Sequence, residues 1–265
     1  MSETSAAAEE PVVVRERHGK VEVVRINRER ARNAIDGPTA LALSSTFDEL
    51  EEDSGVWAVI ITGTGERAFC AGMDLKAFAS GQMGDILGAK GGFGGLSHRE
   101  FPKPLIAAVN GAALAGGFEL VLSCDLVVAA DHATFGVPEV KRGLVAAGGG
   151  VIRLAKRTHY AVALELILTG DPVDAARAYE LGLVNKVVPA AEVMQAALAL
   201  AERICENAPL SVRESKRVAR RSLDLTEADA WTLNTEATAK VFSHPDAMEG
   251  AISFAEKRSP VWSGD

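Results

Sequence analysis

The sequence predicts an α/β fold with a helical C-terminal part, and two observations support this prediction. Three short runs, residues 57–62, 105–109 and 125–130, are almost entirely apolar, which is typical of parallel strands covered on both faces. From about Val151 onward the apolar residues recur at helical spacing instead. Strands followed by helices indicate an α/β core with appended helices, and 265 residues are enough for one such large domain.

In chain order, the first expected element is a hairpin. Two β-branched runs, Val12–Arg17 and Val21–Ile26, flank a short turn that contains glycine. A helix is expected over Thr39–Glu52, where Asp36 or Gly37 can cap it beside Pro38. The three apolar strands come next. The remaining expected elements are helices over residues 161–168, 174–181, 190–207, 210–222, 226–242 and 245–257, and a short strand at 183–188. Residues 1–11 are small and acidic and are expected to be a disordered leader.

Charge and composition exclude several classes of protein. The chain carries 28 Lys and Arg against 36 Asp and Glu, a net charge of −8, which argues against a nucleic-acid surface and against a polybasic membrane anchor. No apolar run approaches the roughly 20 residues that cross a bilayer, and the first residues do not form a signal peptide. Three widely spaced cysteines predict a reduced, cytoplasmic compartment, and the absence of Cys-x-x-Cys and His-Glu-x-x-His predicts no metal site.

Glycine is concentrated in one part of the chain, because 18 of its 25 residues lie between Gly63 and Gly150. Three glycine-rich stretches stand out there, residues 68–76, 110–120 and 143–150. A glycine-rich turn between a strand and a helix can present backbone N–H groups to a phosphate or to a developing oxyanion. None of the stretches fits a dinucleotide fingerprint, a P-loop or a nucleophile elbow. Without such a motif, purely structural turns are the favoured interpretation of these stretches.

Two acids lie in these glycine-rich surroundings. Glu119 follows Gly116 by three residues, in the first turn of an expected helix, and Glu139 follows Pro138 at the end of an expected strand. Burial in apolar surroundings raises the pKa of a carboxyl group towards the range useful for proton transfer. On spacing alone, a helix-dipole role for Glu119 and a solvated loop position for Glu139 are favoured over catalytic roles.

These residues together resemble the crotonase superfamily, the enoyl-CoA hydratases and isomerases, over about Val12 to Trp262. The resemblance implies a spiral of ββα units over residues 12–189 and a helical oligomerisation region over 190–265 that assembles trimers or dimers of trimers. The motifs that carry it are A-F-C-A-G-M-D-L-K at 68–76, A-V-N-G-A-A-L-A-G-G-F-E-L at 108–120, Cys124-Asp125, F-G-x-P-E at 135–139, L-T-G-D at 168–171, A-x-x-x-G-L-V-N-K-V-V at 178–188 and F-A-E-K-R at 254–258.

The resemblance also implies an acyl-CoA thioester substrate and no cofactor beyond the CoA that the substrate carries. The N–H groups of Met73 and Gly116 would form an oxyanion hole for the thioester carbonyl. Glu119 would activate a water that attacks Cβ, and Glu139 would protonate Cα, so that water adds in the syn sense to a 2-trans-enoyl-CoA. The remaining substrate contacts carried over from the family are Ala71, Asp74, Leu75, Lys76, Arg30, Ala34, Phe254 and Lys257. For the cations among them, a solvated surface position is the alternative.

Several features of the sequence do not allow the substrate or the exact reaction to be assigned. Glu29, Ala115 and Ala146 stand where the family often has proline, glycine and proline. The segment at 80–96 is glycine-rich and has few large side chains, so we expect it to be mobile, either as a lid over the acyl pocket or as a surface loop. An isomerase, a carnitinyl-CoA-type dehydratase or a non-catalytic acyl-CoA binder remain alternatives to the hydratase.

Overall fold

The computed structural model of the chain describes residues 10–264, so residues 1–9 of the predicted leader lie outside the described residues. Its main feature is a six-stranded sheet in the order β1-β2-β3-β5-β7-β10. The first two strands form the predicted antiparallel hairpin, and the other pairs are parallel. The strands are β1 (Val13–His18), β2 (Val21–Ile26), β3 (Ala58–Gly63), β5 (Leu105–Val109), β7 (Leu126–Ala130) and β10 (Lys186–Val188).

A second sheet of four short strands has the order β4-β6-β8-β9. Its members are β4 (Ala68–Cys70), β6 (Ala112–Leu114), β8 (Thr134–Gly136) and β9 (Val173–Asp174). From β3 to β8 the chain alternates between the large sheet and the small one, and helical segments follow each visit to the small sheet. This is the repeated ββα spiral that the resemblance to the crotonase superfamily implies.

The helical segments that follow the small-sheet strands build the functional site. Those after β4 are α2 (Leu75–Ala79), α3 (Met83–Gly88) and the 3-10 turn η2 (Phe93–Gly95). The helix after β6 is α4 (Gly116–Ser123), whose residues are all buried. Those after β8 are η3 (Pro138–Arg142), α5 (Gly150–Arg157) and α6 (Tyr160–Thr169), and α7 (Ala175–Glu180) follows β9.

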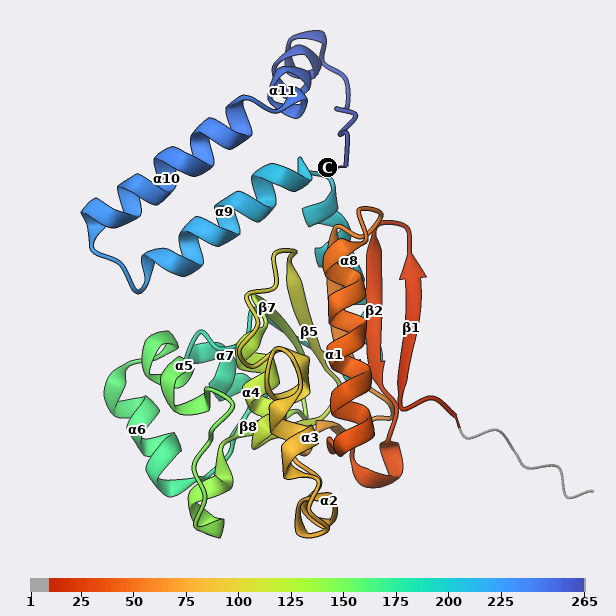
Figure 1. Cartoon of the computed structure of the whole chain (residues 1–265), viewed down its shortest axis with the longest axis vertical. Coiled ribbons are helices and arrows are strands. Elements are labelled where there is room, and N and C mark those ends of the chain that lie inside the picture. The colour runs from red at the N-terminus through yellow and green to blue at the C-terminus, as the bar shows by residue number, and fades with distance from the viewer. Residues whose placement is uncertain (1–9, 265) are drawn as a thin grey trace, which may run out of the picture.

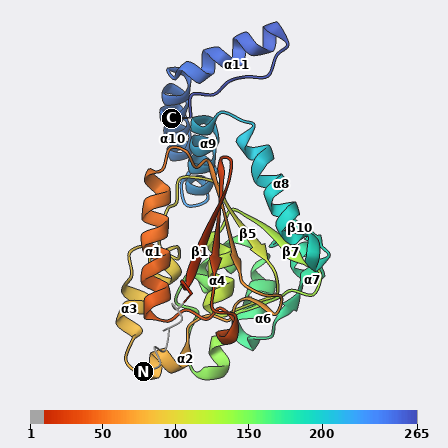
Figure 2. The same ribbon diagram turned by 90° about the vertical axis from the view of Figure 1, so that its right-hand side faces the viewer.

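Two long helices cover the six-stranded sheet from opposite sides (Figure 2). One is α1 (Gly37–Glu52), which begins as predicted, because the Asp36 side chain accepts a hydrogen bond from the Thr39 amide at 3.0 Å. The other is α8 (Val193–Cys205), which contacts β2, β3, β5 and β7. The predicted helix at 190–207 therefore covers the core, and it starts with a 3-10 turn, η4 (Ala190–Glu192).

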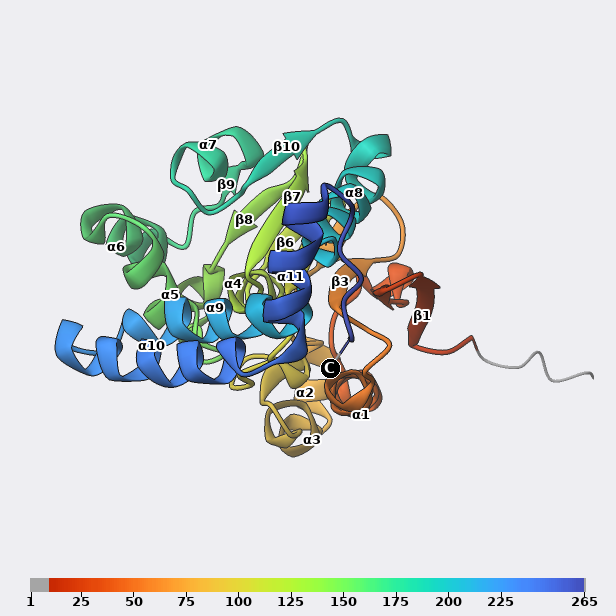
Figure 3. The ribbon, with the colours of Figure 1, turned by 90° about the horizontal axis from the view of Figure 1, so that it is seen from above.

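The last three helices stand apart from the sheets (Figure 1). They are α9 (Pro209–Ser222), α10 (Glu227–Phe242) and α11 (Pro245–Glu256). Seen from above, α9 and α10 run side by side (Figure 3). Their surfaces expose large apolar side chains, among them Trp231, Phe242 and Phe254. The use of these helices for oligomerisation remains a prediction.

The sequence expectations fail mainly where elements are short. The strands β4, β6 and β9 were not expected, and β10 begins at Lys186 rather than at Leu183. These strands contain only two or three residues, too few to show an alternating pattern. The segment at 80–96, expected to be mobile, contains α3 and η2 and packs against α1, with Ile86 and Leu96 fully buried.

Candidate active site

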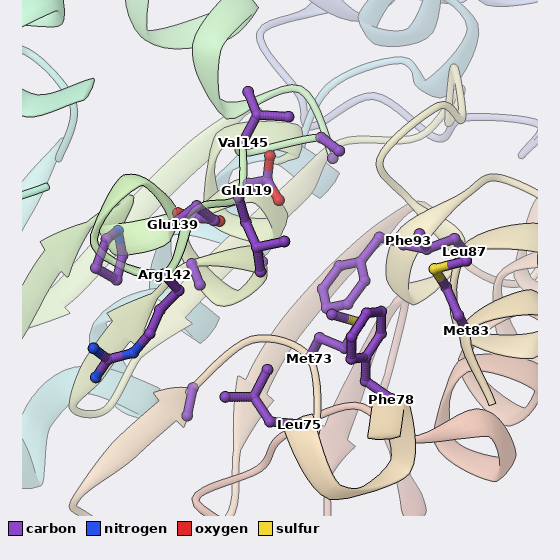
Figure 4. Close-up of a pocket in the computed structure, with 17 residues that line it drawn as sticks. Met73, Leu75, Phe78, Met83, Leu87, Phe93, Glu119, Glu139, Arg142 and Val145 are labelled. Carbon is purple, nitrogen blue, oxygen red and sulfur yellow. The ribbon is translucent and has the colours of Figure 1, made fainter. Parts of the chain in front are cut away.

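A cavity of about 390 Å³ opens between the segments that follow β4, β6 and β8 (Figure 4). Glu119 and Glu139 lie next to each other on one side of it, and Met73, Phe78 and Phe93 lie opposite. The lining is largely apolar, and the residues that form it are Ala71, Met73, Leu75, Phe78, Met83, Leu87, Phe93, Ala115, Gly116, Glu119, Pro138, Glu139, Arg142, Leu144, Val145, Ala147 and Gly148.

Two backbone N–H groups are free at this cavity. The amide of Ile35 donates to Gly72 O at 2.8 Å, and the amide of Asp74 donates to Ile35 O at 2.9 Å. These bonds flank Met73, so its own N–H points away from Ile35. Gly116 is the first residue of α4, where a helix leaves its N–H groups unpaired. Neither amide has an acceptor within residues 10–264, so both are available to the oxygen of a ligand.

Close backbone approach brings these two amides together. A Cβ at Gly72 would lie 3.0 Å from the nitrogen of Gly116, and Gly72 has a φ of +92° that side chains rarely adopt. A Cβ at Gly117 would lie 1.9 Å from Cys70 O. The N-terminus of α4 therefore lies directly on the β4 backbone, and glycine is required at both positions.

Ala115, which stands where the family often has glycine, carries backbone strain. Its φ is +52° and its ψ is −131°, a region that alanine occupies at a cost of about 1–3 kcal/mol. We expect Ala115→Gly to raise the free energy of unfolding by about 1 kcal/mol, after the entropy that glycine gains in the unfolded chain. Chemical denaturation of both proteins measures this difference. A variant less stable than the wild type would contradict the strain assigned to Ala115.

Glu119 lies on the first turn of α4 and is buried, with 4% of its surface exposed. Its Oε1 accepts a hydrogen bond from the amide of Gly150 at 2.8 Å. A Cβ at Gly148 would lie 2.7 Å from Oε2, and one at Gly150 would lie 3.1 Å from Oε1. Burial raises the pKa of Glu119, and hydrogen bonds from the amides of Gly150 and Gly148 oppose that rise. The third glycine-rich stretch thus forms a backbone cradle around this carboxylate.

Glu139 lies on η3, and its environment differs from that of Glu119. Its Oε2 is buried and has no hydrogen-bond partner among the described residues. Burial raises the pKa of Glu139 to about 7; a backbone hydrogen bond opposes the rise, and the charge of Glu119 adds to it. Two adjacent carboxyl groups, one held by amides and one unpartnered, can bind a water between them and divide the roles of base and acid.

The pKa of Glu139 predicts a pH-dependent stability. The folded protein keeps this proton up to a pH of about 7, whereas an unfolded chain loses it near 4.5. Between these values the folded state binds more protons, so ionisation of Glu139 reduces stability as the pH rises. Above pH 7, the free energy of unfolding of Glu139→Gln should therefore exceed that of the wild type by on the order of 1–3 kcal/mol. Denaturant titrations from pH 4 to 8 measure the difference, which should vanish towards pH 4.

The wall opposite the carboxylates comes from the segment at 80–96. Phe93 packs over the start of α4, since a Cβ at Gly116 would lie 2.5 Å from its ring. Met83 and Leu87 line the same wall from α3. The sequence reasoning did not identify these residues, although Met83 and Leu87 are four apart and would share a helix face. The segment borders the acyl side of the cavity as expected, but as a packed wall.

Of the predicted substrate contacts, Ala71 and Leu75 line the cavity together with Met73 and Gly116. Asp74 does not, because its side chain caps α2 through the amides of Lys76 and Ala77 and pairs with Arg28 at 3.1 Å. Lys76 and Arg30 are exposed on α2 and on the 3-10 turn η1 (Glu29–Ala31). Contacts of these two cations with CoA phosphates remain predictions.

Three other predicted contacts also lie outside the cavity lining. Ala34 is buried, and its carbonyl accepts a hydrogen bond from Arg28. Phe254 is 87% exposed on α11, and Lys257 caps the end of that helix with a φ of +55°. Because α11 stands at the far end of the molecule from α2 and α3 (Figure 1), these two residues are not brought to the cavity of their own chain.

Comparison with known proteins decides the family. The family model for enoyl-CoA hydratase/isomerase matches residues 16–265. The chain belongs to the enoyl-CoA hydratase/isomerase family. This confirms the resemblance to the crotonase superfamily on which the oxyanion amides and the two acids were predicted.

Residues 10–264 contain no helix long and apolar enough to cross a membrane. They also contain no group of three or more His, Cys, Asp or Glu side chains that could hold a metal ion.

Members of the family with different names resemble this chain. A carnitinyl-CoA dehydratase from Proteus mirabilis is 41% identical over 251 residues, which cover 93% of this chain and 96% of that protein. The crystal structure of an enoyl-CoA hydratase from Mycobacterium tuberculosis is 46% identical with a TM-score of 0.93, covering 97% of this chain and all of the other. A carnitinyl-CoA hydratase from Mycobacterium avium is 46% identical with a TM-score of 0.77, at the same coverage.

Proposed function

We propose that this family member is an enoyl-CoA hydratase that adds water in the syn sense to a 2-trans-enoyl-CoA. The observation that carries the proposal is the pair Glu119 and Glu139 beside one cavity that also receives two unpaired amides. Both carboxyl groups are needed for a reaction that moves two protons, one from water and one to Cα. CoA would enter only as part of the substrate, and no other cofactor is required.

In the proposed mechanism the thioester oxygen accepts hydrogen bonds from the amides of Met73 and Gly116. Ionised Glu119 takes a proton as the water oxygen attacks Cβ, and the electrons of the double bond move onto the thioester as an enolate. Protonated Glu139 then delivers its proton to Cα. At this point Glu119 is protonated and Glu139 is ionised. A proton then returns from Glu119 to Glu139 through water, which restores the starting state. The amide that donates to Glu119 and the pKa of about 7 at Glu139 support this division of roles.

The reverse reaction is the second candidate, because several relatives are named carnitinyl-CoA dehydratases. Dehydration uses the same two acids and the same amides. A carnitinyl group, however, carries a quaternary ammonium. The cavity offers it apolar side chains and Arg142, and among the described residues no carboxylate lines it except Glu119 and Glu139. We therefore propose an uncharged acyl chain, which the wall of Leu75, Phe78, Met83, Leu87 and Phe93 would cover.

A panel of thioesters tests both proposals. We expect hydration of crotonyl-CoA, followed as loss of the conjugated thioester absorbance. The value of kcat/KM should rise about fourfold for each added methylene until the wall is reached, since a buried methylene contributes about 0.8 kcal/mol. The trimethylammonium analogue, crotonobetainyl-CoA, should be at least about tenfold poorer than an uncharged chain of similar size. A preference for the charged analogue would favour the dehydratase, movement of the double bond without hydration would favour an isomerase, and binding without turnover would favour a binder.

A further inference from the structure

The turn at residues 148–150 separates a carboxylate from a guanidinium. Glu119 lies against Gly148 and Gly150, as described above. On the other side of the turn, a Cβ at Gly149 would lie 2.3 Å from Nη1 of Arg153. Glu119 and Arg153 therefore flank the same three glycines, and no side chain stands between them at these positions.

Arg153 holds two separate parts of the site. Its Nη1 donates to Gly148 O at 2.9 Å, and its Nη2 donates to Ser97 O at 2.5 Å. Gly148 belongs to the cradle of Glu119. Ser97 follows the wall segment, and its amide donates to Phe93 O at 3.2 Å. One guanidinium thus joins the turn that holds the acid to the segment that carries the aromatic wall.

The guanidinium of Arg153 has no ion-pair partner among the described residues that would account for a cation at this position. Among residues 10–264, no carboxylate lies within ion-pair distance of it. The charged and titratable groups that face it are Arg157 on α5, Arg220 on α9, Cys124 at the end of α4 and Glu119 itself. Two of these are cations, which disfavour a further half-buried cation. Glu119 is the one carboxylate that gains from it, and Glu139 faces Glu119 from η3.

We propose that Arg153 is a positioning residue that orients the cradle and keeps Glu119 ionised, so that the proton of the acid pair stays on Glu139. This role rests on the proposed hydratase function. Burial favours the neutral form of Glu119, whereas the amides of Gly150 and Gly148 and, through the turn, the Arg153 cation favour its carboxylate form. Without Arg153, the two acids would become more alike and the neutral form of Glu119 would persist to higher pH.

The test compares Arg153→Met with Arg153→Lys and with a matched control, Arg157→Met. Arg157 lies four residues further along α5, and its Nη2 donates to Cys124 O at 2.9 Å in a partly buried hydrogen bond away from the cradle. For Arg153→Met we expect kcat for crotonyl-CoA to fall about tenfold near neutral pH. The acidic limb of the kcat profile should move up by about one pH unit or somewhat less. Because Arg153→Lys keeps the positive charge, its acidic limb should lie close to that of the wild type.

A second measurement does not depend on turnover. The Glu119 carboxyl group of ¹³C-glutamate-labelled protein, assigned through its loss in Glu119→Gln, can be titrated by NMR. Its midpoint should rise in Arg153→Met and stay within 0.2 units, roughly the experimental error, in Arg157→Met. The proposal is overturned if neither the limb nor the midpoint moves in Arg153→Met, or if Arg157→Met moves both equally. If the wild type hydrates no enoyl-CoA, the hydratase proposal fails, and the titration alone decides the role of Arg153.

Discussion

Glu139→Gln and Glu119→Gln should each lower kcat for crotonyl-CoA hydration by about 10³-fold or more. Glutamine keeps the shape of the side chain but can neither deliver a proton to Cα nor accept one from water, and positioned acid–base groups contribute about 10²–10⁴-fold. KM should change much less, because the apolar wall and the two amides proposed to bind the thioester remain. Steady-state kinetics over a range of crotonyl-CoA concentrations separates the two effects.

The double variant gives a further check on the same pair. If the two acids share one water, removing both should cost little more than removing either, since groups that act as a unit are not additive. Glu165→Gln serves as the control, because Glu165 is exposed on α6 and does not line the cavity. Wild-type rates in both single variants would eliminate the proposed mechanism, even if the enzyme still bound CoA esters.

Gly117→Ala should damage both stability and turnover. The new methyl group would lie 1.9 Å from Cys70 O and 2.7 Å from Cys70 C, and neither backbone atom can rotate away. The start of α4 must move off β4, which we expect to cost about 3 kcal/mol and to lower Tm by roughly 6–12 °C. The amide of Gly116 moves with it, so kcat should fall by about 10²-fold through loss of oxyanion geometry.

Gly84→Ala is the matched control for this variant. Gly84 lies in the first turn of α3, and nothing lies within 4 Å of a Cβ built on it. Alanine there should leave kcat unchanged and should stabilise the helix by up to about 1 kcal/mol. Thermal unfolding and kcat, measured side by side for the two variants, test the contact between α4 and β4. Equal melting temperatures for Gly117→Ala and Gly84→Ala would contradict the close packing of α4 on β4.

Much of the fold was predictable because its main strands are buried on both faces. The run at 105–109 coincides with β5, and the hairpin and α1 differ from prediction by a residue or two at their ends. The small sheet was harder to predict from the sequence. Its strands β6 and β8 have three residues each, and they pair with each other although they are well separated in the chain. The segment at 80–96 was misjudged for another reason. Its few large residues, such as Ile86 and Phe93, are the ones that pack it against the core.

The site could be predicted only in part from residue types. Glu119 and Glu139 were identifiable as acids in glycine-rich surroundings, but spacing alone left their roles open until the family motifs were added. The cradle at Gly148 and Gly150 could not be deduced, because its contact with Glu119 joins residues about 30 positions apart. Arg153 gave no signal at all, since a cation on an amphipathic helix usually faces solvent.

Because the proposed oxyanion hole and the cradle around Glu119 are both made of backbone groups, few substitutions can alter them without disrupting the fold. A codon change replaces a side chain and, unless it introduces proline, keeps the N–H groups of Met73 and Gly116. At Gly117 and Gly148 almost any change introduces atoms where there is no space. New substrates must therefore arise through the wall, at positions such as Phe78, Met83 and Leu87. A library randomised at those three positions should yield altered acyl preferences with the hydration chemistry intact, whereas one randomised over the glycines should yield mostly inactive chains.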